Sequence, residues 1–194
     1  MNKMDGKATM TERYQFDPQQ SRFTVRAFAG GMLMAFGHNP TMAIRDFMGE
    51  VQLTPDVLDA AALHVTIQAP SLAVIDDISR KDRQEMERQM REEVLETAQY
   101  PEIVFASTHV SAEKSTDHQY RVKIKGSLSL HGVTRNEQIT AHVTVYGDTL
   151  RAHGEFTLRQ TDYRIKRATA IGGALKLKDA LKCSFDIVAQ KEHV

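Results

Sequence analysis

Apolar and polar residues alternate along most of this chain. The clearest run is residues 120–130, in which every second residue is apolar or glycine and every residue between them is Arg, Lys or Ser. A period of two residues is the pattern of a β-strand with one buried face. Comparable runs cover residues 23–29, 43–53, 63–69, 139–145, 152–158 and 181–189, and a less regular one covers 102–110. The pattern predicts an antiparallel sheet that is covered on one side.

One segment breaks the alternation and is predicted to be a helix over about residues 79–96. Ten of the fourteen residues from 80 to 93 are charged, which excludes a buried strand, and they are strong helix formers. Ser79 with Asp82 resembles an N-terminal capping pair, and Glu87–Arg91 and Arg88–Glu92 are spaced for pairing along a helix. The helix is expected on the surface of the sheet structure or across one end.

About eight strands with one helix indicate an all-β fold, either a closed antiparallel barrel or a sandwich. The apolar faces carry many small residues: Ala27, Ala29, Gly49, Ala69, Gly126, Ala141, Ala152, Gly154 and Ala189. Eight strands enclose a space that large side chains can fill, so small ones favour an internal cavity. The alternative is that these residues sit where strands bend or crowd.

A cavity of this kind would have a lipophilic wall formed by the inward apolar faces. The wall residues that the alternation predicts are Phe23, Val25, Ala27, Phe47, Val65, Ile67, Phe105, Leu128, Val143, Phe156 and Phe185. Two loops are candidates for its mouth and for a ligand's head group. One carries Met32 and Met34, whose thioethers adapt to varied surfaces, and the other carries Arg164, Lys166 and Arg167.

Composition narrows the class of protein. The 194 residues carry 25 basic and 25 acidic side chains, so the net charge gives no reason to expect nucleic acid as a partner. The single cysteine, Cys183, excludes an intrachain disulfide and is in phase with buried residues. No apolar run reaches the length of a signal peptide or a membrane span, so we expect a cytoplasmic protein. Residues 1–12 lack periodicity and are expected to be loosely attached to one domain over 13–194.

Motifs for catalysis or metal binding are absent from the sequence. The eight histidines show no HxH or HxxxH spacing, and there is no GxSxG, P-loop or CxxC. His109 shares a phase with Phe105 and is the strand histidine expected to point inward, whereas His64, His142 and His153 are expected to face solvent. His131, beside Gly132, is expected in a hairpin turn between strands 120–131 and 134–147, facing solvent and hydrogen-bonding locally.

Several motifs occur in an order that resembles one known family. They are YQFDPQQSRFTVRAF at 14–28, FMGEVQL at 47–53, VLETAQYPEIVFAST at 94–108, LSLHGVTRNEQI at 128–139, FTLRQTDYRI at 156–165 and GALKLKDALKCSFDIVA at 173–189. Together they are similar to the YceI-like, polyisoprenoid-binding proteins with a lipocalin-like fold. Two positions depart from that pattern. Asn136 replaces a hairpin proline, so the second strand is expected to begin later, and Arg164 stands where a glycine is usual.

The resemblance implies an eight-stranded lipocalin-like barrel that holds a polyisoprenoid, an isoprenoid quinone or a fatty-acid-like molecule, without catalysis and without a cofactor. It also implies that many relatives are periplasmic, whereas this sequence shows no leader. Two alternatives stay open: an enzyme acting on such a lipid through His109 or a mouth residue, and a filled barrel that serves as an interaction module. A homodimer formed through the Met-rich loop is a further expectation.

Overall fold

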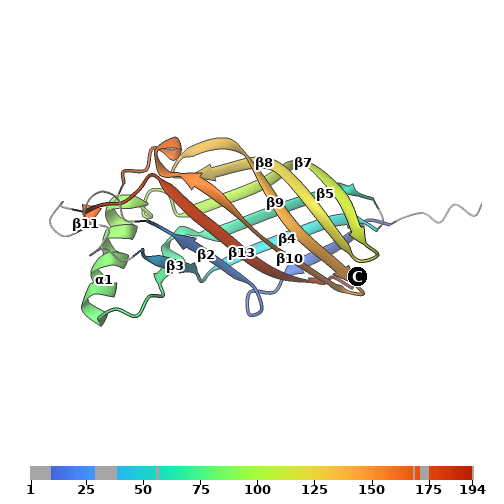
Figure 1. Ribbon diagram of the computed structural model, residues 1–194, viewed down its shortest axis with the longest axis horizontal. Helices are drawn as coiled ribbons and strands as arrows, with labels where there is room; N and C mark the ends of the chain where they lie inside the picture. The colour runs from blue at the N-terminus through green and yellow to red at the C-terminus, as the bar shows by residue number, and fades with distance from the viewer. Residues whose placement is uncertain (1–9, 29–38, 56, 168, 171–174, 194) are drawn as a thin grey trace, which may run out of the picture.

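The fold is a closed antiparallel barrel of eight strands. The computed structural model describes residues 10–28, 39–55, 57–167, 169–170 and 175–193. The barrel strands are β1 (Glu12–Phe16), β4 (Phe47–Thr54), β5 (Val57–Gln68), β7 (Glu102–Thr116), β8 (Gln119–Leu130), β9 (Val133–Tyr146), β10 (Thr149–Arg159) and β13 (Ala180–Lys191). They pair in that order, and β13 pairs with β1 to close the ring (Figure 1). The predicted fold class is confirmed.

Three short strands extend the barrel at one end: β2 (Arg22–Arg26), β3 (Thr41–Ile44) and β6 (Leu72–Val74). β2 pairs with the first half of β13, while β1 pairs with its last residues, so β1 and β2 act as one interrupted strand. The Ser21 hydroxyl bridges the interruption by bonding to the backbone N–H and C=O of Val188 at 3.0 and 3.1 Å. Likewise β3 leads into β4, and β5 leads through the turn η2 (Ala69–Ser71) into β6.

The predicted helix is α1 (Arg80–Gln89), which continues as the π-turn η3 (Met90–Val94). Ser79 caps it by accepting from the backbone N–H of Asp82 at 3.1 Å. The helix lies at the end of the barrel that also carries β3 and the β11–β12 hairpin (Thr169–Ala170 and Leu175–Lys176) (Figure 1). It is attached by polar contacts, because the Val74 N–H donates to Glu87 Oε1 at 3.0 Å and Arg83 donates to a backbone carbonyl.

The β8–β9 hairpin turns through His131 and Gly132, both with positive φ, at 51° and 70°. This is a two-residue turn whose twist matches that of the flanking strands. Leu130 pairs with Val133, so β9 begins directly after the turn. The expectation that Asn136 delays the second strand is wrong.

The expectation that His131 faces solvent and bonds locally is also wrong. Its side chain is only 8% exposed, with Nε2 2.9 Å from Glu96 Oε2 and Nδ1 3.2 Å from the carbonyl oxygen of Tyr163. Its ring lies 4.4 Å from the Tyr100 ring. Residues in a turn leave the strand's alternation, so phase does not predict their direction. His131 therefore joins the hairpin to two segments distant in sequence.

The expectation that His109 points inward is wrong, because a β-bulge precedes this residue. The register of β7 against β8 shifts between Ser107 and His109, which places Val110 in the interior and leaves His109 exposed. One extra residue reverses the alternation beyond a bulge. His64, His142 and His153 are exposed, as predicted, and the last two stack across neighbouring strands at 5.2 Å.

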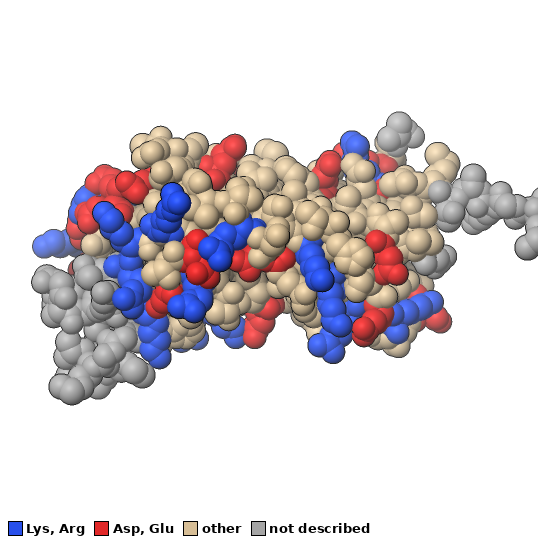
Figure 2. Space-filling model, turned by 90° about the horizontal axis from the view of Figure 1, so that it is seen from above, with Lys and Arg blue, Asp and Glu red and all other residues tan. Residues whose placement is uncertain are grey.

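The outer surface mixes acidic and basic side chains over much of its length (Figure 2). In the described part of the chain, no helix is both long enough and apolar enough to span a bilayer. The expected loose segment 1–12 falls mainly on residues 1–9, which lie outside the described residues, whereas Glu12 already belongs to β1.

The β8–β9 turn gives a test of this packing. An alanine Cβ at Gly132 would lie 2.7 Å from the Tyr100 ring, whereas one at Gly147, also at positive φ, would meet nothing within 4 Å. We expect Gly147→Ala to lower the free energy of unfolding by about 1 kcal/mol through backbone strain alone. Gly132→Ala should cost roughly 2–3 kcal/mol because the ring must also move. Equal losses in urea unfolding would show that the Tyr100 contact is unimportant.

Candidate functional site

The barrel encloses a cavity of about 240 Å³. Its wall includes residues from all eight barrel strands and from β2, β3 and β6. On β8 the lining runs from Val122 to Leu130, which is about 27 Å along the strand and about 20 Å along the axis of a typically tilted barrel. The cavity is therefore a channel along the barrel rather than a local void.

Side chains fill the barrel at the end that holds the C-terminus. Tyr14 and Leu53 follow the lining residues Phe16 and Val51 in the same inward phase, and they are 1% and 2% exposed. The Tyr14 hydroxyl donates to Glu12 at 2.9 Å, and Glu12 also accepts from Lys191 at 2.7 Å. Side chains thus narrow the channel at this end, and its lining continues toward the end that carries α1 (Figure 1).

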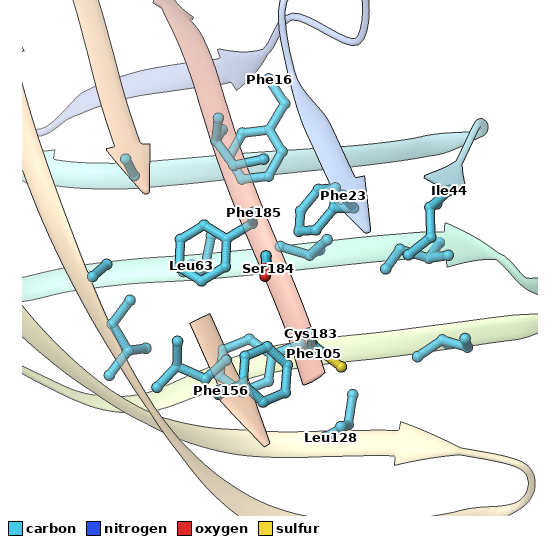
Figure 3. Close-up of a pocket in the computed structure, with 18 of the residues that line it drawn as sticks. Phe16, Phe23, Ile44, Leu63, Phe105, Leu128, Phe156, Cys183, Ser184 and Phe185 are labelled. Atoms are coloured by element: carbon cyan, nitrogen blue, oxygen red, sulfur yellow. The ribbon is translucent and has the colours of Figure 1, made fainter. Parts of the chain in front are cut away.

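Nine of the eleven predicted wall residues line the channel. They are Phe23, Val25, Val65, Ile67, Phe105, Leu128, Val143, Phe156 and Phe185. Phe23, Phe105, Phe156 and Phe185 face the same channel from different strands (Figure 3).

The other two predicted wall residues lie outside the lining. Ala27 is buried where β2 ends, with its N–H donating to the carbonyl of Pro40 at 2.9 Å. Phe47 belongs to a small second core with Ile44 and packs edge-on against Phe23 at 4.9 Å. Phe47 keeps the inward phase that it shares with the lining residue Val51, but at the start of β4 it is covered by the other members of this second core.

Three glycines shape the channel through the phenyl rings that cover them. A Cβ at Gly49 would lie 2.4 Å from the Phe16 ring, one at Gly126 2.4 Å from the Phe105 ring, and one at Gly154 2.7 Å from the Phe185 ring. Each ring therefore occupies the place of a missing side chain on the wall. The small residues were expected to leave space themselves; at these positions they let the rings lie against the wall, which keeps the lumen open.

The channel wall is almost free of polar side chains. Among its lining residues only Thr24, Cys183 and Ser184 carry a hydroxyl or thiol. Burial raises the pKa of the Cys183 thiol to about 12, with a smaller contribution from the Glu137 carboxylate. A thiol in this state is neutral and behaves as a small apolar group. In the described residues, no group of three or more potential metal ligands occurs.

Side chains replace backbone pairing in parts of two seams of the barrel. Between β5 and β7, the Leu63 N–H donates to Ser107 Oγ at 2.8 Å and the Ala112 N–H donates to Asp59 Oδ1 at 2.6 Å.

The other seam lies between β9 and β10. β9 and β10 are paired only from Thr149–Tyr146 to Gly154–Ala141. Beyond that point β9 continues to pair with β8, and β10 with β13, so residues 133–140 and 155–159 have no partner strand across the seam.

The turn η4 (Gln160–Tyr163) and the residues after it cover this seam. Tyr163 is fully buried and donates its hydroxyl to Glu137 Oε1 on β9 at 2.6 Å, while Ile165 lines the channel. Arg164 lies between them at φ 58°, a left-handed conformation that explains why a glycine is usual at this position. Sequence alternation could not reveal this segment, because it is neither a strand nor a regular helix.

The predicted mouth residues divide into two groups. Met32 and Met34 lie outside the described residues. Arg164, Lys166 and Arg167 are exposed beside Ile165, at the seam. The structure thus places these cations next to the channel, and their contact with a head group stays a prediction. Ile44, Leu72, Leu95 and Ile165 line the channel without having been predicted, because they belong to short strands or connections.

The sequence matches the model of the YceI-like domain over residues 14–189. BcnA of Burkholderia cenocepacia has a similar structure, with a TM-score of 0.70 at 15% identity over 89% of this chain and 98% of that one. A polyisoprenoid binding domain from Saccharophagus degradans gives 0.67 at 14% identity over 92% and 98%. The YceI protein of Campylobacter jejuni gives 0.59 at 15% identity over 78% and 85%. Comparison with curated protein sequences gives no match.

The buried tyrosines and thiol predict a loss of stability at alkaline pH. Burial raises the pKa of Tyr163 well above its usual 10, and the Glu137 hydrogen bond adds to this; Tyr14 behaves alike beside Glu12. The unfolded chain releases these protons at about pH 9–10 while the folded chain keeps them, so stability is full below that range and falls above it, by about 1.4 kcal/mol per pH unit for each group.

Variants separate the contribution of one tyrosine. Tyr163→Phe should be less stable overall, and its unfolding free energy should fall less steeply above pH 10 than that of the unmodified protein. Tyr146→Phe, at a 71% exposed position, should keep the original slope. Identical slopes for Tyr163→Phe and the unmodified protein would show that this hydroxyl is not protected from ionisation.

Proposed function

This chain belongs to the YceI-like domain family, and from that membership and the shape of its channel we propose that it binds one long hydrophobic or amphiphilic molecule inside the barrel. The observation that carries the proposal is the long channel lined by apolar side chains and kept open by rings packed over glycines. A polyisoprenoid, an isoprenoid quinone or a fatty-acid-like chain has the matching chemistry. One structural relative is itself a polyisoprenoid binding domain.

Burial of the ligand supplies the binding free energy. Each buried methylene contributes about 0.8 kcal/mol, so about ten of them supply roughly 8 kcal/mol before the cost of association. The wall offers only two hydroxyls and one neutral thiol, so length and shape select the ligand more than hydrogen bonds do. The polar head of the ligand lies at the end of the barrel that carries α1 and η4, because the side chains of Tyr14 and Leu53 occupy the opposite end (Figure 1).

The protein acts as a carrier or a store of this molecule, without changing it. His109, the histidine considered for acid–base chemistry, is exposed on the outer face, and the lining side chains provide no acid–base pair. An enzyme acting on the lipid would instead convert it, so recovery of the ligand unchanged after long incubation distinguishes the two functions.

Titration of lipid-free protein tests the proposal. The chain contains no tryptophan, so binding is followed by displacement of a polarity-sensitive dye and by native mass spectrometry. All-trans-geranylgeraniol and palmitic acid should each bind with one-to-one stoichiometry, whereas geraniol, with a shorter chain, should bind more weakly. If the protein bound none of these three ligands, the proposal would be refuted.

A narrowed channel gives a sharper test. The three atoms nearest to a Cβ at Gly49 all belong to the Phe16 ring, so in Gly49→Ala the ring must move, and we expect it to move into the lumen. Loss of contact with about two methylenes should weaken geranylgeraniol binding about tenfold. Adding Phe16→Ala to Gly49→Ala should restore binding, and Gly147→Ala serves as the control substitution. Unchanged affinity in Gly49→Ala would show that the ligand does not occupy this part of the channel.

A further inference from the structure

The net charge of the whole chain is zero, but its basic residues are concentrated in one segment. Residues 164–182 contain six basic residues (Arg164, Lys166, Arg167, Lys176, Lys178 and Lys182) and one acidic residue (Asp179), which gives this segment a net charge of +5. The whole chain has 25 of each sign. The excess follows the segment that covers the β9–β10 seam and continues into β13.

Four of these cations form an exposed surface without acidic partners. Arg164, Lys166, Arg167 and Lys178, called here the basic end, are exposed, and no ion pair involves them among the described residues. The neighbouring Asp179 is engaged elsewhere, because it accepts from Arg159 at 3.0 Å and from the Thr161 hydroxyl at 2.7 Å.

The acids of α1 do not neutralise the basic end. Arg88 bonds to Glu85, Glu92 and Glu93, and Arg91 lies 3.8 Å from Glu87. The helix thus satisfies most of its own charge. Figure 2 shows several Lys and Arg side chains at the end of the molecule that carries α1 and β11, beside a group of acidic side chains.

The basic end also adjoins the channel. Ile165, between Arg164 and Lys166, lines the channel and is almost fully buried. The Lys178 N–H donates to the carbonyl of Phe28 at 2.7 Å, which ties this cation to the end of β2. The exposed cations therefore lie beside the β9–β10 seam, where the Tyr163–Glu137 hydrogen bond, and not a backbone ladder, joins the wall.

From this placement we propose that the basic end docks on an anionic lipid bilayer. Lipid phosphates would pair with these cations, which have no acidic partner among the described residues. Each basic residue near an anionic membrane surface adds to the binding free energy. A bilayer is preferred over nucleic acid on the basis of the proposed function, because a long apolar ligand partitions into membranes and would be exchanged with them. Docking would bring the seam and the channel end toward the lipid.

Vesicle flotation tests the docking. The unmodified protein should bind vesicles containing phosphatidylglycerol, should not bind vesicles of phosphatidylcholine alone, and should dissociate at high salt. In the triple variant Lys166→Gln, Arg167→Gln, Lys178→Gln, partitioning should fall about a hundredfold, at about fivefold per cation. Arg164 is left unchanged because of its left-handed backbone.

A matched control removes the same charge from the side of the barrel. Arg121→Gln, Lys125→Gln and Arg151→Gln affect exposed cations on β8 and β10 that have no ion pair among the described residues. This variant should partition nearly as well as the unmodified protein. An equal loss in both triple variants would overturn the assignment to the basic end, and so would tighter binding to a short DNA duplex than to the anionic vesicles.

The experiment separates docking from ligand binding. Lipid-free protein and the Gly49→Ala variant should float with phosphatidylglycerol vesicles as the unmodified protein does, because docking uses the outer surface. Protein that binds geranylgeraniol but not these vesicles overturns the docking proposal alone. Protein that floats but binds no chain overturns the proposed function alone.

Discussion

The closure of the barrel between β1 and β13 is the constraint on which the rest of this structure depends. Only three residue pairs join these strands, Tyr14–Lys191, Gln15–Gln190 and Phe16–Ala189. The hydroxyl of Ser21 and the Lys191–Glu12 ion pair reinforce the junction. Because a closed barrel has no free edge, its inner faces meet across one space, and the sizes of the inward side chains decide whether that space is a core or a channel.

Because phenyl rings pack over glycines, the space inside the barrel is a channel and not a filled core. Phe16, Phe105 and Phe185 contribute large apolar surface yet lie against the wall, because the glycine opposite each ring has no side chain. The fold thereby keeps aromatic packing energy and an open lumen together. The same barrel is less regular at the β9–β10 seam, where Tyr163 and Glu137 replace a ladder of backbone hydrogen bonds. The exposed cations of the basic end lie next to this seam.

The alternation of side chains was sufficient to predict seven of the eight barrel strands, the helix and most of the channel wall. It did not predict β1 (Glu12–Phe16), the strand that closes the barrel. It succeeded where a strand is regular, as in β8 from Val122 to Leu130. It failed where one residue changes the phase or the direction of the chain, at the bulge before His109 and at the turn at His131. Phe47 is in the predicted phase but is covered by a second small core. Ring-over-glycine packing and the η4 cover depend on contacts between distant segments, which the pattern of a single strand does not contain.

Chemical identification of the bound molecule would show whether the channel is a binding site for a long apolar chain. The protein is purified from cells without detergent, extracted with organic solvent and examined by mass spectrometry, beside the Gly49→Ala variant prepared in the same way. We expect one dominant long-chain apolar molecule in near-equimolar amount from the unmodified protein and much less from the variant. Equal traces of mixed lipids from both proteins would contradict a channel built to bind a chain.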